Sequence, residues 1–168
     1  MKRRPRLTRA RLRELLRYNR RTGEFRWRKR PRGWTRLELS AGYLSKQGYR
    51  CINIDGRFYR EHQLAWFYVT GQWGRPTIDH RDGDVSNNRW NNLRRATASQ
   101  NNANRRRPRH NRSGYKGVWF CRESGKWRAK ITVNRRVICL GRFDTPQAAH
   151  AAYIAAARRF FGEFARAE

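Results

Sequence analysis

The chain has 168 residues, of which 41 are Lys or Arg and only 12 are Asp or Glu, so that its formal net charge is +29 and its pI is about 11.7. Self-repulsion on this scale is tolerated mainly beside nucleic acid or an anionic membrane. No apolar run approaches the roughly 18 residues of a membrane-spanning helix, and no signal-peptide core follows the basic start. We therefore expect a cytoplasmic protein that binds nucleic acid and no membrane.

Length and residue usage leave room for one medium domain or two small ones. The 7 Trp, 8 Phe and 7 Tyr can anchor small cores despite a hydrophobic content of 38%. Cys51, Cys121 and Cys139 lie far apart and form no Cys-x-x-Cys pair, which argues against a zinc finger. A sparse, odd set of cysteines also fits a reducing cytosol better than a secreted disulfide scaffold.

The N-terminal elements are short. Residues 1–6 form a basic arm, and Thr8 can cap a helix over residues 9–18, whose leucines share one face. Residues 24–28 alternate as a strand does, and residues 29–41 lack periodicity and are expected to be a loop.

A tight β-hairpin is predicted next. Residues 49–54 and 57–60 are strand-like segments joined by the turn pair Asp55-Gly56. A short helix over residues 61–69 follows and is broken at Gly71.

The C-terminal third has a different organisation. Residues 102–114 are almost wholly polar and basic, and so we place a domain boundary within them. Residues 115–120, 126–133 and 136–143 are predicted to be three strands, and Pro146 stands in the first turn of an Ala-rich helix. The fold class is therefore α+β, ending in a three-stranded antiparallel sheet packed on one C-terminal helix.

Asp79, His80, Asn92 and Asn101 carry the residue types that phosphodiester hydrolysis needs. Asp79 and Asn101 supply oxygen ligands for one divalent ion. His80 is suited to take a proton from water near neutral pH, and Asn92 can orient the imidazole through a hydrogen bond. Because Asp79 and His80 are neighbours on a strand, their side chains should point to opposite faces unless a twist or bulge brings them together.

These residues fall in motifs that resemble the HNH endonucleases, especially the phage and intron-encoded homing type. The motifs are Asp-His-x-Asp-Gly at 79–83, Asn-Asn-Arg-x-x-Asn-Leu at 87–93 and Ser-Gln-Asn at 99–101. Upstream, Tyr-Asn-x-x-Thr-Gly-Glu-Phe-x-Trp at 18–27 and Glu-His-Gln-Leu-Ala-Trp at 61–66 are also similar to these proteins. The resemblance extends over about residues 8 to 105 and implies a ββα-metal nuclease module, preceded by an N-terminal helix and hairpin.

The resemblance also implies a role for each residue. Asp79 and Asn101 would be metal ligands, His80 the general base, and Asn92 the central Asn that braces the loop and orients His80. Asn101 stands where the family name has a second His, which favours Mg²⁺ or Mn²⁺ over Zn²⁺ as the ion.

Structural interpretations compete with these roles. A lone Asp-His pair is usually a turn with a surface imidazole, but the ordered spacing of the motifs favours the catalytic interpretation. We interpret Asn87 and Asn88 as turn formers, Gly83 as serving loop geometry, and His62 as a structural residue at the start of an apolar helix.

A second resemblance covers about residues 112 to 165. Segments 113–118, 125–131, 140–143 and 148–153 are similar to the plant Apetala-2/ethylene-response-factor DNA-binding domain, which also occurs fused to HNH nucleases. It implies a three-stranded sheet laid into the major groove, with the helix packed behind it.

The strand period supports this independently. Arg128, Lys130 and Thr132 share one face, suited to DNA, whereas the odd positions of 127–133 share the other, suited to the helix. Family contact positions on the first strand fall on Trp119 and Cys121, where arginines are typical. The alternatives are a merely solvated basic face and, for the linker arginines, a solvated tether. The predicted DNA-binding residues are Arg105, Arg106, Arg107, Lys116, Trp119, Arg122, Lys126, Arg128, Lys130, Thr132, Arg135 and Arg136.

Together, these features predict a metal-dependent homing-type DNA endonuclease, acting as a monomer or weak dimer that nicks one strand of double-stranded DNA. The alternative is a catalytically silent, sequence-specific DNA-binding regulator; RNA binding is less favoured. Its expected setting is the cytoplasm of a bacterial or phage-infected cell, associated with the nucleoid. The predicted domains are a basic arm with a short helix and strand (1–40), an HNH nuclease module (41–105), a basic linker (106–112) and a β-sheet DNA-binding domain (113–168).

Overall fold

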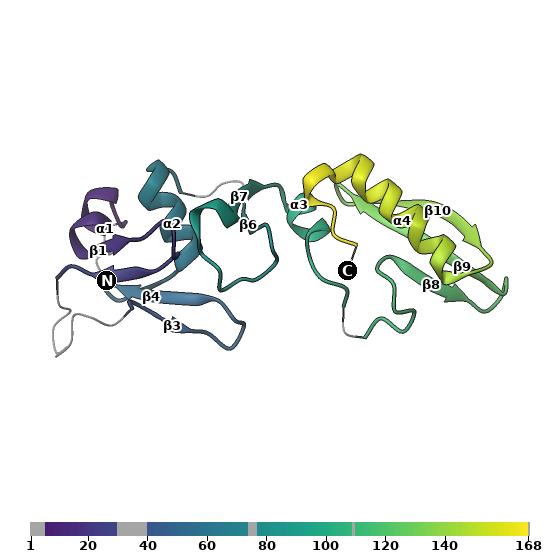
Figure 1. Cartoon of the computed structure of the whole chain (residues 1–168), viewed down its shortest axis with the longest axis horizontal. Helices are drawn as coiled ribbons and strands as arrows, with labels where there is room; N and C mark the ends of the chain where they lie inside the picture. Colours follow the sequence, from purple (N-terminus) through teal and green to yellow (C-terminus); the bar gives the residue numbers. More distant parts are fainter. Residues whose placement is uncertain (1–5, 30–39, 74–76, 109, 168) are drawn as a thin grey trace. The chain divides into compact units, whose positions relative to one another are not determined.

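A computed structural model of the chain describes residues 6–29, 40–73, 77–108 and 110–167. The chain divides into two compact units, Met1–Arg95 and Ala96–Glu168 (Figure 1). This division falls ahead of the polar stretch in which composition places a boundary, and the predicted domain limits stay a prediction. Most of the expected basic arm and of the expected loop over 29–41 lies outside the described residues. Within the described part of the chain, no helix is long and apolar enough to cross a membrane.

The first unit consists of short elements around one core. Its helices are α1 (Arg9–Leu15), α2 (Glu61–Thr70) and the 3-10 turn η1 (Trp90–Asn92). Its strands form three small sheets. Two of them have two strands each: β1 (Leu16–Tyr18) pairs with β2 (Phe25–Trp27), and β6 (Thr77–His80) pairs with β7 (Leu93–Ala96). The third has three strands, β3 (Tyr43–Leu44), β4 (Arg50–Ile54) and β5 (Arg57–Arg60). The predicted hairpin is confirmed, and its turn places Asp55 and Gly56 at φ 51° and 77°, as a tight two-residue hairpin turn requires.

The first helix is shorter than predicted. Thr8 caps it, its hydroxyl accepting from the Arg11 amide at 3.1 Å, but the helix ends at Leu15 rather than at residue 18. Residues 16–18 instead become β1, because pairing with β2 buries Leu16 and stacks Tyr18 on Phe25 with ring centroids 4.8 Å apart. Burial of these side chains outweighs the local helical preference.

The core of the first unit joins α1, the two hairpins and α2. Its largest fully buried apolar side chains are Leu12, Leu16, Phe25, Ile52, Ile54 and Leu64. Helix α2 ends at Gly71 in the left-handed conformation, with its amide donating to the carbonyl of Phe67. This core fixes the start of α2, which carries Glu61 and His62, beneath the β6 segment described below.

The second unit is the predicted sheet and helix. Its elements are α3 (Ala98–Ala103), β8 (Val118–Cys121), β9 (Lys126–Val133), β10 (Arg136–Phe143), α4 (Pro146–Phe161) and the 3-10 turn η2 (Gly162–Phe164). The antiparallel sheet has the order β10-β9-β8, and α4 packs on it (Figure 1). Ala149 and Tyr153 of α4 are buried against Ala129 and Ile131 of β9, which confirms the predicted fold class.

Small size at Gly117 is required for this packing. Gly117 has φ +73°, and a Cβ there would lie 2.3 Å from the Tyr153 ring and 2.8 Å from the carbonyl oxygen of Lys130. Gly114 has a similar φ of +77° but no atom within 4 Å of such a Cβ. A substitution at Gly114 would therefore cause backbone strain alone, whereas the same substitution at Gly117 would cause backbone strain and a steric clash.

We therefore expect Gly117→Ala to destabilise the second unit by clearly more than Gly114→Ala. The control should lose only the roughly 1–2 kcal/mol that a left-handed backbone costs an alanine. Hydrogen exchange of the β9 amides in both variants measures the difference, and equal protection in the two variants would contradict the packing described here.

Candidate active site

Asp79 and His80 lie at the end of β6, and both are buried. As neighbours on a strand they have different partners. The Asp79 carboxylate Oδ2 accepts from Arg94 Nε at 2.9 Å, and both side chains are 6% exposed. His80 Nε2 lies 3.1 Å from Oδ1 of Asn88. The imidazole is therefore held in the interior and not on a surface turn.

Asn92 braces the loop that follows β6. Its Oδ1 accepts from the Asp82 amide at 3.1 Å, and its Nδ2 donates to Asp82 Oδ1 at 2.9 Å and to the carbonyl of Asn87 at 2.8 Å. Its backbone carbonyl also accepts from the Arg81 amide at 2.9 Å. The bracing role inferred for Asn92 stays a prediction with which these contacts are compatible, whereas the side chain bonded to Nε2 of His80 is that of Asn88 and not that of Asn92.

The loop also stabilises a charged carboxylate at Asp82. Burial alone would raise the pKa of Asp82, but hydrogen bonds from the Asp84 amide and from the Asn92 and Asn87 side chains outweigh it and lower this pKa below its ordinary value. Asp82 therefore stays ionised, and its hydrogen bonds keep the loop closed over residues 82–92.

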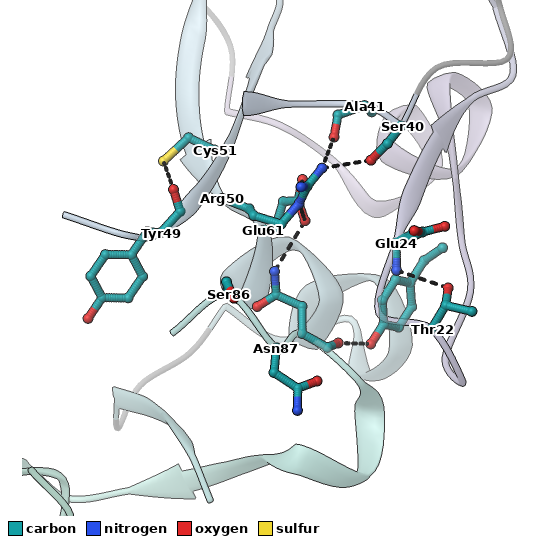
Figure 2. A network of polar contacts seen from close by, with 12 residues as sticks. Thr22, Glu24, Ser40, Ala41, Tyr49, Arg50, Cys51, Glu61, Ser86 and Asn87 are labelled. Atoms are coloured by element: carbon teal, nitrogen blue, oxygen red, sulfur yellow. Dashed lines mark hydrogen bonds and ion pairs between the residues drawn. The ribbon is translucent and has the colours of Figure 1, made fainter. Parts of the chain in front are cut away.

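Asn88 connects His80 to a fully buried carboxylate. Asn88 is 2% exposed, and its Nδ2 donates to Oε2 of Glu61, itself 0% exposed, at 3.1 Å. Arg50 donates to both oxygens of Glu61 through Nε, at 3.1 and 3.2 Å, and through Nη2 to the Ser40 hydroxyl at 2.6 Å. Figure 2 shows Arg50 lying between Glu61 on one side and Ser40 on the other. We call Arg50, Glu61, Asn88 and His80 the buried polar chain.

The buried polar chain determines which nitrogen of His80 carries a proton. Arg50 can only donate, and so the Glu61 carboxylate accepts from it and from the Asn88 amide nitrogen. When Glu61 is ionised, the amide oxygen of Asn88 faces His80, so that Nε2 is the donor and Nδ1 is the nitrogen with the lone pair.

Two neighbouring groups on α2 have displaced pKa values. Burial raises the pKa of Glu61 to about 7, against the opposing attraction of Arg50. Burial lowers the pKa of His62 to about 3, with smaller contributions from His80 and Arg60. His62 is thus a neutral ring, packed edge-on to His80 with centroids 5.0 Å apart, in keeping with the structural role inferred for it.

The β1–β2 hairpin holds the other side of Asn88. The Tyr18 hydroxyl donates to the Asn88 carbonyl at 2.6 Å, and the Trp90 amide donates to the Arg20 carbonyl at 2.9 Å. Gly23 lies so close that a Cβ would be 2.5 Å from the backbone of Asn88 and Arg89. Residues 88–90 are therefore fixed by elements nearly 70 residues upstream.

Sequence reasoning did not find Glu61 and Asn88, which it left in a helix start and in a turn. The available signal was a carboxylate opening an apolar helix, because a charged residue on a buried face requires a partner. That partner could not be named from the sequence, since it lies 27 residues away.

A divalent ion would depend on oxygen donors here. Asp79 supplies a carboxylate kept next to Arg94, and Asn101 stands on α3 in the second unit, so their pairing stays a prediction. Among the described residues, no three His, Cys, Asp or Glu side chains are grouped so that they could hold a metal. The chemistry of a carboxylate with an amide fits Mg²⁺ or Mn²⁺ better than Zn²⁺.

The sheet of the second unit presents the predicted basic face. Arg128 lies directly across from Trp119 on β8 and from Arg142 on β10, and Lys130 Nζ stands 4.9 Å from the Trp119 ring centroid. Arg142 belongs to this face although the sequence reasoning did not include it. Of the predicted contacts, Trp119 and Arg128 are half-buried, and the exposed ones are Arg105, Arg106, Arg107, Arg122, Lys126, Lys130, Thr132, Arg135 and Arg136.

The structure corrects the assignment of Lys116. This side chain is 9% exposed, and its Nζ donates to the carbonyls of Ala103, Arg105 and Arg166 at 2.5, 2.6 and 3.2 Å. Burial lowers its pKa to about 8. Lys116 therefore ties the end of α3 to the C-terminal segment within its unit and does not face DNA.

The first unit thus holds a buried, hydrogen-bonded histidine at the end of β6, and the second unit is a β-sheet domain with a basic face. Comparison with protein families agrees. Residues 59–103 match the HNH endonuclease family, and residues 113–163 match the AP2 domain family. The chain thus carries an HNH endonuclease domain followed by an AP2 domain, which confirms both resemblances drawn from the sequence.

Curated relatives match one part or the other. Protein 3.8 of Escherichia phage T7 is 35% identical over 74 residues, which are 44% of this chain and 61% of that protein. APETALA2-like protein 2 of Oryza sativa subsp. indica is 45% identical over 58 residues, or 34% of this chain and 13% of that protein. An AP2-like ethylene-responsive transcription factor of Arabidopsis thaliana is 45% identical over 58 residues, covering 34% and 12%. The chain thus spans less than two thirds of these relatives, and no solved structure matches it.

The raised pKa of Glu61 predicts a pH dependence of stability. At pH values between 4.5, the ordinary pKa of a glutamate, and about 7, Glu61 is protonated in the folded state but has lost its proton in the unfolded state. This contribution to stability is therefore complete below pH 4.5 and is lost as the pH rises to 7. The free energy of unfolding of the wild type, minus that of Glu61→Gln, should fall by up to about 3 kcal/mol over this range.

Urea denaturation at a series of pH values measures this difference. The comparison with Glu61→Gln is needed because the lowered pKa of His62 acts in the opposite direction over an overlapping pH range, from about 3 to 6.5. A difference that does not change with pH would contradict the account of Glu61.

Proposed function

We propose that the protein is a metal-dependent DNA endonuclease that hydrolyses a phosphodiester of double-stranded DNA. The observation that carries this proposal is the buried His80, held by Asn88 inside the HNH domain with Nδ1 as its basic nitrogen. A general base needs a defined tautomer and orientation, and the buried polar chain supplies both. A surface histidine in a turn would need neither.

In the proposed reaction, Nδ1 of His80 takes the proton of the attacking water. Asp79 and Asn101 would hold a Mg²⁺ or Mn²⁺ ion, whose chemistry when bound is to neutralise charge on the phosphate and on the departing 3′ oxygen. Arg94 pairs with the Asp79 carboxylate and fixes its orientation. The products would be 5′-phosphate and 3′-hydroxyl ends.

The AP2 domain would provide DNA binding and the choice of target. Its exposed Arg and Lys side chains suit phosphate contacts, and the face around Arg128, Lys130 and Trp119 suits the major groove. One active site cuts one strand, and so a monomer or weak dimer acting by nicking is the expected mode. The homing type is proposed from the motifs at 79–101, and the likeness of part of the chain to a protein of phage T7 supports a setting in the cytoplasm of a bacterial or phage-infected cell.

We expect purified wild-type protein to convert supercoiled plasmid to open-circle or linear DNA with Mg²⁺ or Mn²⁺, and to lose this activity in EDTA. His80→Ala should cut at least about 100-fold more slowly, because it lacks the general base. Tight DNA binding by the wild type without cleavage under either metal would favour the regulator alternative. Equal cleavage by both proteins would contradict the role of His80.

Asn88 and Asn87 provide a matched pair for the positioning of His80. Asn88→Ala should reduce the single-turnover cleavage rate by roughly 10- to 100-fold, because the imidazole loses its orienting acceptor. Asn87→Ala removes a similar amide that bonds Asp82, and it should have a much smaller effect. Thermal unfolding of both variants checks that they are folded. Equal rates in the two would contradict the assignment of Asn88.

A further inference from the structure

The β1–β2 hairpin has one apolar face and one strongly basic face. Leu16, Tyr18 and Phe25 are buried in the core of the first unit. Arg17 and Arg26, between them in sequence, are exposed and lie directly opposite each other across the two strands. The face that the hairpin turns to solvent thus carries two arginines at directly opposite positions.

These arginines line a cavity of about 440 Å³ together with Arg20 and polar groups of the turn. Glu24, at the same cavity, has Oε2 3.6 Å from Nη2 of Arg26, and the two side chains are 45% and 66% exposed. Such a pair contributes little in water. Among the described residues, no carboxylate lies within ion-pair distance of Arg17 or Arg20.

Several other arginines of the unit have carboxylate partners. Arg11 on α1 pairs with Glu14 and Asp55, and buried Arg94 and half-buried Arg50 each have a carboxylate. Like charges directly opposite on two strands are destabilising. A site that places three arginines around one open cavity is therefore complementary to an anion that bridges them.

A phosphodiester backbone is the anion that fits best. Guanidinium groups bind phosphate through two parallel hydrogen bonds, and the cavity is open and polar, so that it suits a chain of phosphates passing over the surface better than an enclosed small anion. Segment 16–29 carries six basic residues and one acidic one, which extends the positive field beyond the cavity itself.

The hairpin is also fixed relative to His80. The carbonyl of Arg20 accepts a hydrogen bond from the Trp90 amide. The Tyr18 hydroxyl donates to the carbonyl of Asn88, whose side chain contacts Nε2 of His80. A phosphate held by Arg17 and Arg26 is thereby placed at a constant distance from the imidazole within the same unit. We propose that the basic face of the β1–β2 hairpin binds the backbone of double-stranded DNA as a contact separate from the AP2 domain. This inference rests on the proposed function, because it names how the nuclease unit itself holds its substrate.

The test is the salt dependence of duplex binding by the full chain, measured in EDTA by fluorescence anisotropy. The double variant Arg17→Gln/Arg26→Gln should make the negative slope of log K for DNA binding against log salt concentration shallower by about 1.8, since each phosphate contact contributes about 0.9. Arg17→Lys/Arg26→Lys retains both charges and should keep most of the slope. The matched control is Arg13→Gln/Lys46→Gln, which removes two exposed charges of the same unit outside the cavity.

The outcomes separate this inference from the nuclease itself, because cleavage is assayed separately with Mg²⁺ or Mn²⁺. A fall in slope that is confined to the Gln pair at the hairpin supports the contact, even if no cleavage is found. An unchanged slope, or the same fall in the control, overturns the contact even if the wild type cleaves DNA. Thermal unfolding of each variant confirms that the compared proteins are folded.

Discussion

The ion pair between Glu61 and Arg50 is the interaction on which the candidate site depends. A fully buried carboxylate is costly unless its oxygens are satisfied, and here a guanidinium and an amide satisfy them. The amide belongs to Asn88, whose other end orients His80. Removing any residue of the buried polar chain would leave a buried polar group without its partner. The orientation of the His80 ring therefore depends on all the hydrogen bonds of the buried polar chain.

The same constraint explains why the N-terminal hairpin belongs to the nuclease unit. The carbonyl of Asn88 is bonded by Tyr18, and Gly23 packs directly on the backbone of residues 88–89. The HNH family match begins only at residue 59, yet the segment that orients His80 is supported by residues 18–23. The strands that carry the basic side chains on the outer face of that hairpin are consequently fixed in position relative to His80.

Positive charge has two distinct uses in this molecule. Most Lys and Arg side chains remain exposed, where they suit a polyanion. A few form contacts inside the protein: Arg50 and Arg94 form ion pairs with buried carboxylates, and Lys116 donates hydrogen bonds to backbone carbonyls. The net charge of +29 therefore overstates the charge available for binding, and it does not indicate which cations face DNA.

Local patterns were sufficient to predict the turn at Asp55-Gly56, the cap at Thr8, the three strands of the second unit and the order of the HNH motif, because each depends on residues adjacent in the chain. The end of α1 at Leu15, the burial of Lys116 and the role of Asn88 could not be predicted in this way. Each results from partners that lie 7 to 70 residues away and that folding alone brings together. Chemical identity is local, whereas burial and hydrogen-bond pairing are properties of the packed chain.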